Sequence, residues 1–259
     1  MSQLPTASHW YEIEQLDETL FKVWEPHVID FMQANMFVVR GERECLLIDG
    51  GNGVIPLRPF LAKHGIHPSI VVASHAHADH IGALHEWPLT LVHASEARGL
   101  ATLDPDVTLA KPGYSIMDIG TLMTDGTGPT GPTISALPFA DFTAKDFKLR
   151  APQSVKTIED GVIIDLGARC FEVLHVPGHC PGQLAFWDEA NKVLISCDAI
   201  YDYAPLDTLH HSNKVDYRNS FERLLMLEPK VTHGGHMGSI DLARYREVIE
   251  TYLHGDKSS

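Results

Sequence analysis

The sequence predicts an α/β fold in which short buried strands alternate with amphipathic helices. Apolar runs recur in both halves of the chain, and each is bounded by turns rich in Gly, Asp or Asn. Residues 70–73 (IVVA) form a continuous apolar run, which is typical of a strand buried on both faces. Two segments near the C-terminus instead repeat apolar residues with the helical period. We expect residues 1–259 to form a single domain.

Short length and apolar or β-branched residues identify the strands. The first two, residues 36–40 (MFVVR) and 45–48 (CLLI), flank a turn that contains Gly41. The Asp-Gly-Gly-Asn-Gly stretch at 49–53 then interrupts the chain before the run at 70–73. In the C-terminal half, the predicted strands are residues 161–166, 170–175, 184–187 and 193–196.

Three segments carry helix signals. Residues 54–64 form the first, because Pro56 is tolerated in a first helical turn and Gly65 ends the segment. Residues 216–227 form the second, and Pro229 stops it. The third, residues 239–254, has an apolar stripe made of Leu242, Tyr245, Ile249, Tyr252 and Leu253.

Residues 104–154 differ from the rest of the chain. They are rich in Pro, Gly and Thr, as in GTGPTGPT at 126–133, and their apolar periodicity is weak. A stretch of this length with little regular structure is usually functional or disordered. Because it carries Phe139, Phe142 and Phe147, we expect an ordered cap or insertion over the site, with a flexible surface insertion as the alternative.

Composition excludes several classes of partner. The net charge of −14 repels phosphate backbones, so we expect no nucleic-acid partner. No run approaches the roughly 18 apolar residues of a membrane span, and we expect no membrane partner. The N-terminus shows no secretory signal. The four cysteines lack C-x-x-C spacing, which indicates reduced thiols and a cytoplasmic location.

Ligand-type side chains are concentrated at residues 71–82 (VVASHAHADHIG). His75, His77, Asp79 and His80 lie within six residues, directly after the predicted strand. Imidazole and carboxylate are preferred ligands of zinc and its neighbours. Alternate residues of a strand point the same way, so His75 and His77 can share one metal. The following turn can direct Asp79 and His80 toward a second, and a chance His-rich loop is the alternative.

The H-x-H-x-D-H pattern after a buried strand resembles the signature of the metallo-β-lactamase superfamily. Later segments resemble its further motifs in the same order: HVPGHCPG at 175–182, ISCDAIYD at 195–202 and HGGHMG at 233–238. LLIDGG at 46–51 matches as well. The resemblance covers roughly residues 10 to 254. It implies an αββα sandwich, in which two mixed sheets pack face to face, helices lie outside and the site lies at one edge.

The resemblance also implies two divalent metal ions per chain. We expect zinc, although such donors also accept Mn, Fe or Co. It assigns His75, His77 and His179 to the first ion, Asp79, His80 and His236 to the second, and Asp198 to both. We choose His236 over His233 because Gly-Gly-His at 234–236 resembles the Pro-Gly-His of the family.

Such a centre is expected to hydrolyse its substrate through a metal-bound hydroxide. Two cations lower the pKa of a shared water and stabilise the oxyanion that forms on the substrate. We expect Asp79 to orient the hydroxide and to pass its proton to the leaving group. Asp49 is a candidate acceptor for the N–H of a ligand histidine. A turn-forming role of Asp49 before Gly50 is the alternative.

Within the superfamily the motifs favour hydrolysis of an acyl thioester or ester. His77 stands where the di-iron flavoprotein branch has Glu, and Asp198 disfavours the β-lactamases. Acyl-CoA hydrolases and acyl-homoserine lactonases both place a tyrosine three residues after the bridging Asp, as Tyr201 is here. We expect Tyr201 to hydrogen-bond a substrate carbonyl, with packing under the sheet as the alternative. The insertion before His179 and the segments at 9–25 and 198–225 resemble the acyl-CoA group.

The resulting prediction is a dinuclear metal-dependent hydrolase of a small acyl substrate. An acyl-homoserine lactonase is the first alternative. A β-lactamase-like enzyme or a non-catalytic metal-binding sensor is a further one, although an intact ligand set argues against the sensor. A homodimer is compatible with the sequence. Cys180 and Cys197 depart from the family pattern and are interpreted as small buried groups. His210 and His211 match no motif; an entrance position is one interpretation of them.

Overall fold

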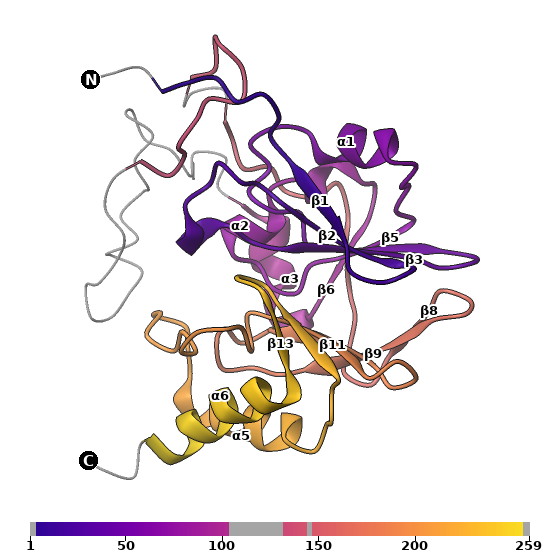
Figure 1. Ribbon diagram of the computed structural model, residues 1–259, viewed down its shortest axis with the longest axis vertical. Coiled ribbons are helices and arrows are strands. Elements are labelled where there is room, and N and C mark those ends of the chain that lie inside the picture. Colours follow the sequence, from indigo (N-terminus) through magenta and orange to yellow (C-terminus); the bar gives the residue numbers. More distant parts are fainter. Residues whose placement is uncertain (1–3, 104–131, 144–146, 256–259) are drawn as a thin grey trace.

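The computed structural model describes residues 4–103, 132–143 and 147–255. Its strands form two sheets that lie one above the other, with helices on their outer faces (Figure 1). This arrangement is the predicted αββα sandwich of two mixed sheets.

The first sheet has seven strands, and their order in the sheet is their order in the chain. They are β1 (Glu12–Gln15), β2 (Leu20–Trp24), β3 (Met36–Arg40), β4 (Cys45–Ile48), β5 (Ile70–Val72), β6 (Thr90–Val92) and β7 (Val155–Thr157). Strands β1 to β4 pair antiparallel, and β4 to β7 pair parallel. The parallel part carries the end of β5, where the ligand-rich segment begins.

The second sheet has six strands in the order β13-β12-β11-β10-β9-β8. They are β8 (Ile163–Asp165), β9 (Cys170–His175), β10 (Leu184–Asp188), β11 (Val193–Cys197), β12 (Val231–Gly234) and β13 (Ser239–Asp241). Strands β11 and β12 run parallel, and the other neighbouring pairs run antiparallel. Parallel β11 and β12 therefore end at the same edge of the sheet.

The helices divide between the two outer faces. They are α1 (Leu57–Lys63), α2 (Ala78–Ile81), α3 (Ala94–Ala101), α5 (Lys214–Leu224) and α6 (Leu242–Gly255), with 3-10 turns at Asp30–Met32 and Leu84–Glu86. Residues of α1, α2 and α3 pack into the apolar cluster outside the first sheet. Helices α5 and α6 cover the second sheet, at the bottom of Figure 1.

Alternating side chains explain how each sheet contacts two layers. On β3, Met36 and Val38 belong to the cluster under the first set of helices, whereas Phe37 and Val39 face the second sheet. This period of two is the geometry of a strand buried on both faces. The second sheet does the same, with Phe186 between the sheets and Trp187 against the outer helices. Three apolar layers thus separate four layers of secondary structure.

Most predicted elements are confirmed, with shifts at their ends. The predicted strands correspond to β3, β4, β5, β8, β9, β10 and β11. The first helix begins at Leu57 rather than residue 54, because Pro56 keeps an extended backbone with ψ 125° before it. Residues 239–241 were predicted as helix but form β13, which pairs with β12.

The predicted cap falls partly outside the described residues, because residues 104–131 and 144–146 are not among them. In the described part, Ile134, Phe142 and Phe147 are buried in the cluster with α1 and α2, whereas Phe139 is 47% exposed. The backbone N–H of Ile29 donates to Thr133 O at 3.0 Å, which ties this part to the N-terminal half. The single domain over 1–259 and the cap over the site stay predictions.

Candidate metal centre

The motif residues lie where β5 ends. The strand stops at Val72, and the chain bends at Ser74 and His75 before His77 takes the N-cap position of α2. Helix α2 then presents Asp79 and His80 from one turn. A strand followed at once by a short helix therefore brings both kinds of donor to the same sheet edge.

Asp198 and His236 come from the adjacent ends of β11 and β12. Cys197 has a φ of 47°, a conformation that few non-glycine residues adopt, and the chain turns there. A Cβ built on Gly235 would lie 2.0 Å from Asp198 Oδ1, so glycine permits the carboxylate to approach. The Asn35 side chain holds the turn around His236 by donating to Gly234 O and Met237 O, both at 2.9 Å.

His179 comes from the loop between β9 and β10. Gly178 before it has a φ of 141°, and a Cβ there would lie 2.4 Å from Tyr217 Cα of α5. The Nδ1 atom of His179 donates to Leu206 O at 3.1 Å, which leaves Nε2 directed at the other donors. Packing against α5 thus fixes the backbone, and the loop before α5 fixes the ring.

The first donor group contains His75, His77, His179 and Asp198, whose ligand atoms all lie within 4.8 Å of one another. His179 Nε2 is 2.9 Å from His77 Nδ1 and 3.5 Å from Asp198 Oδ2. His75 Nε2 is buried and has no hydrogen-bond partner. Buried polar atoms are rarely left unpaired, so this nitrogen fits a metal ligand better than a structural histidine.

The second group contains Asp79, His80 and His236. The Nε2 atoms of His80 and His236 lie 3.4 Å apart, and His236 Nε2 lies 3.5 Å from Asp79 Oδ2. Donors about 2.1 Å from one ion in tetrahedral geometry stand about 3.4 Å apart. These separations are long for hydrogen bonds and suit a shared cation.

Asp198 lies between the groups. Its Oδ1 is 3.3 Å from His80 Nε2, and its Oδ2 is 3.4 Å from His236 Nε2. Oδ2 also faces His75 and His179 of the first group, at 3.9 and 3.5 Å. The structure therefore brings together all seven residues that the sequence proposed as ligands.

Electrostatics differ between the groups. Burial and neighbouring histidines lower the pKa of His75 and His77 well below the usual range, and burial lowers the pKa of His179 to about 4. These rings are therefore neutral near pH 7, with lone pairs available to a metal. For His80, burial opposes a raised pKa, but the charges of Asp198, Asp79 and Asp49 outweigh it.

Burial alone would raise the pKa of Asp198, but His80 and His236 hold it well below its usual range. The carboxylate is thus ionised at the centre of the cluster. A buried negative charge surrounded by imidazoles is the electrostatic environment that favours a bound cation.

Asp49 supports the cluster from beneath. It accepts the N–H and the hydroxyl of Ser74, both at 2.7 Å, and His80 Nδ1 at 2.8 Å. Because Asp49 contacts the Nδ1 atom of His80, the Nε2 atom of the same ring faces the other donors. Asp49 also has a φ of 65° in the turn before Gly50, so it serves in the turn and in the ring contact together.

His233 lies apart from both groups. Its Nδ1 is 2.7 Å from Ser239 Oγ, and its ring lies 5.8 Å from that of Phe37. Burial lowers its pKa to about 4. Cys180 and Cys197 are also buried, and burial raises the pKa of both thiols, so they are protonated and pack as small groups.

Tyr201 lies beside the second group. Its ring is 6.0 Å from that of His236, and the side chain is 8% exposed. Its hydroxyl oxygen accepts the N–H of Leu206 at 3.1 Å. Burial raises the pKa of the phenol, so its proton stays available for donation.

His211 was not proposed as a site residue, although the structure brings it to the cluster. Its Nε2 lies 2.6 Å from His77 Nε2, on the side of the ring away from His179. The contact joins residues 134 positions apart in the chain, and no motif spacing points to it.

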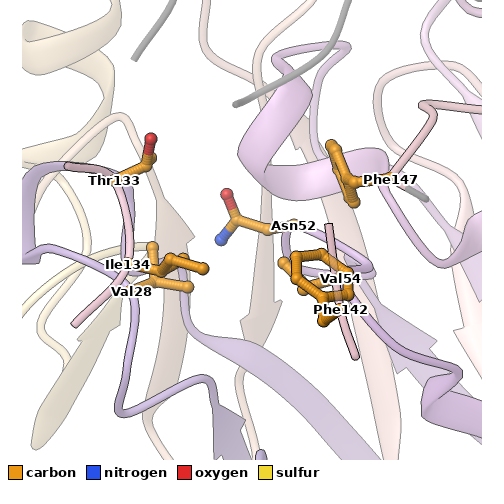
Figure 2. Close-up of a pocket in the computed structure, with 7 residues that line it drawn as sticks. All are labelled: Val28, Asn52, Val54, Thr133, Ile134, Phe142 and Phe147. Carbon is orange, nitrogen blue, oxygen red and sulfur yellow. The ribbon is translucent and has the colours of Figure 1, made fainter. Parts of the chain in front are cut away.

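A small apolar pocket lies between the described part of the cap and the N-terminal half. It is lined by Val28, Asn52, Val54, Thr133, Ile134, Phe142 and Phe147 (Figure 2). The loop that carries Asn52 packs against the end of α2, since a Cβ on Gly53 would lie 2.3 Å from Gly82 C. One wall of the pocket is therefore continuous with the helix that carries Asp79 and His80.

The sandwich fold and the donor cluster define a metal-dependent hydrolase. Residues 29–236 match the Metallo-beta-lactamase superfamily, and the chain belongs to it. The chain is 30% identical over 267 residues to acyl-coenzyme A thioesterase MBLAC2 of Bos taurus, with 96% of this chain and 88% of that protein covered. MBLAC2 of Homo sapiens is similar to the same extent.

More distant proteins share the fold. Metallo-beta-lactamase family protein TTHA1429 from Thermus thermophilus superimposes with a TM-score of 0.68 at 21% identity, covering 94% of this chain and 81% of that one. ST1585 from Sulfolobus tokodaii gives a TM-score of 0.62 at 19% identity, covering 94% and 89%. In the described part of the chain, no helix is long and apolar enough to cross a membrane.

Proposed function

We propose that this chain hydrolyses an acyl thioester, with a thioester of coenzyme A as the preferred substrate. The observation that carries the proposal is the pair of donor groups joined by Asp198. The similarity to MBLAC2, named an acyl-coenzyme A thioesterase, extends over nearly the whole chain and supports the choice of bond.

We propose two divalent ions, expected to be zinc, held as the sequence implied. The first would be held by His75, His77 and His179, the second by Asp79, His80 and His236, and both by Asp198. When bound, such ions supply an activated water and polarise an acyl carbonyl. The donor separations and the unpaired His75 Nε2 support this assignment.

Two side chains are proposed to act on the reacting atoms. Asp79 lies in α2 beside His236 and has a carboxylate that can orient the attacking water. It then passes the proton of that water to the departing sulfur. Tyr201 accepts a backbone N–H from Leu206, so its own O–H is free to donate to the substrate carbonyl.

We propose that residues 104–154 form a cap and that the acyl group lies against its described part. The pocket in Figure 2 is lined mainly by apolar side chains, and both of its phenylalanines, Phe142 and Phe147, come from this segment. Ile134→Trp should fill the pocket and lower turnover of a long acyl-CoA more than that of a short one. Ile163→Trp, the same change at a position that is 56% exposed and lies outside the pocket lining, is the matched control. Equal effects on both chain lengths would contradict the acyl pocket.

An acyl-homoserine lactonase is the second candidate. The observation that favours it is the spacing from Asp198 to Tyr201, because the O–H of Tyr201 could donate to a lactone carbonyl bound at the centre that contains Asp198. The same centre could act on both substrates, so only rates distinguish them.

The test compares substrates on protein of known metal content. The substrates are a medium and a long acyl-CoA, an acyl-homoserine lactone and a chromogenic cephalosporin. We expect thioester turnover that a chelator abolishes and added zinc restores. Lactone turnover alone would support the second candidate, and cephalosporin turnover a β-lactamase-like enzyme. No turnover with two ions bound would contradict an acyl hydrolase and favour a metal-binding sensor.

A further inference from the structure

The ring of His77 lies between two other imidazoles. Its Nδ1 is 2.9 Å from His179 Nε2, inside the first donor group, and its Nε2 is 2.6 Å from His211 Nε2. Each ring nitrogen can either donate a proton or offer a lone pair. The Nδ1 atom of His77 therefore faces the first donor group, whereas its Nε2 atom faces His211. The tautomer of His77 decides which of the two nitrogens has a lone pair for a metal.

We infer that His211 is a positioning residue for His77, an inference that rests on the proposed metal centre. His211 Nε2 accepts the N–H of His77 Nε2, and this hydrogen bond leaves the lone pair of His77 on Nδ1. It also fixes the angle of the ring, as outer partners of metal-bound histidines commonly do. His211 itself contacts no reacting atom.

The chain directly after His211 is anchored to the loop that carries His179. The Ser212 hydroxyl donates to His179 O at 2.7 Å, and the Asn213 N–H donates to Gly178 O at 2.8 Å. Asn213 also caps α5, because its side-chain oxygen accepts the N–H of Val215 at 2.9 Å. The loop before α5 thus sets the position of two ligands, His179 directly and His77 through His211.

The other histidines of the cluster show what is distinctive about this contact. His80 Nδ1 contacts the buried carboxylate of Asp49, and His75 Nδ1 contacts the buried hydroxyl of Ser74 at 2.9 Å. His211 is instead an exposed imidazole that lies outside both donor groups. Removing it leaves the core packing intact and disturbs the first donor group alone. The second group, which has its own support in Asp49, should keep its affinity.

Cobalt(II) binding tests the inference without relying on activity. Metal-free wild type, His211→Leu, His211→Gln and His210→Leu are titrated with cobalt(II), and visible spectra report each bound ion. We expect His211→Leu to weaken one of the two ions by about 10–100-fold and to alter its spectrum. His211→Gln keeps an acceptor oxygen and should restore most of the affinity. His210→Leu, which removes the preceding imidazole, should match wild type.

The outcomes separate this inference from the proposed function. Wild-type binding and spectrum in His211→Leu, with two ions bound to each, would overturn the role of His211 and leave the metal centre standing. Wild-type protein that binds no cobalt would overturn both. Thermal unfolding of the metal-free proteins is the folding control; a purely structural role would lower the unfolding temperature without changing the cobalt spectrum.

Discussion

Gly235 lies against the carboxylate that joins the two donor groups. A methyl group there would approach Asp198 Oδ1 to 2.0 Å and His80 Cε1 to 3.1 Å, and the backbone carbon of Cys197 at 3.0 Å limits any adjustment. We expect Gly235→Ala to displace Asp198, lower the bound metal below two ions and reduce turnover at least tenfold. Elemental analysis and thioester assays measure both. Gly238→Ala, where a Cβ meets nothing within 4 Å, is the matched control and should behave as wild type.

Asp79 provides the second prediction at this scale. Asp79→Asn keeps the size of the side chain and removes its ability to take a proton. Loss of a positioned proton-transfer group lowers rates by about 100- to 10,000-fold. We expect a drop of this order in kcat with an unchanged far-ultraviolet circular dichroism spectrum. Turnover within a few-fold of wild type would show that Asp79 moves no proton.

Single residues also show where sequence reasoning succeeds. His75, His77, Asp79 and His80 were predicted together because they are contiguous and because one strand end presents them all. The contact of His211 with His77 depends instead on how the loop before α5 packs against Gly178. That packing is tertiary, and a histidine outside any motif gives no sign of it.

Most elements with strong apolar patterns were predicted, whereas the edge strands β1, β7 and β13 and the interior strands β2, β6 and β12 were missed. Strands β3, β4, β9 and β10 are mainly apolar, and their predicted positions hold within a residue. Strand β1 has the polar sequence EIEQ and is stabilised by pairing with β2 at the sheet edge. Strand β13 begins a segment with helical periodicity, but pairing with β12 overrides the local preference.

Two turns from different sheets are joined by Arg169. It donates to Asp17 in the turn between β1 and β2 at 2.8 Å and to Asp188 at the end of β10 at 2.7 Å. Burial opposes the shift, but hydrogen bonds from Thr19 and Leu20 and the charge of Arg169 lower the pKa of Asp17.

Because the pKa of Asp17 is lower in the folded state, the ionised carboxylate stabilises the fold at pH values above the pKa of the unfolded state, which is near 4. This contribution is lost as the pH falls through the pKa of the folded state. Because the carboxylate is 39% exposed, we expect Asp17→Asn to cost only about 0.5 kcal/mol at pH 7. Urea unfolding at pH 7 and near pH 3 should show the difference shrinking in acid. A difference that grows in acid would refute the assignment.

For the whole molecule, the cluster spans both sheets. The N-terminal sheet region supplies His75, His77, Asp79 and His80, and the second sheet region supplies the other three donors. Ions that bind the folded state alone stabilise it by about 2.7 kcal/mol at 100 times their dissociation constant. We expect the calorimetric unfolding temperature to fall after chelation and to rise with zinc concentration. An unfolding temperature that does not change with zinc concentration would contradict metal binding by donors from both sheets.

The strand order of the two sheets has one more consequence. Strands β1 to β7 complete the first sheet before β8 begins the second, so a cut between residues 158 and 162 would separate the chain into two halves without dividing either sheet. Neither fragment would contain enough donors for either proposed ion. Co-expressed halves should associate through the apolar faces that the two sheets bury against each other. Enzymatic turnover would then show that the two halves have assembled.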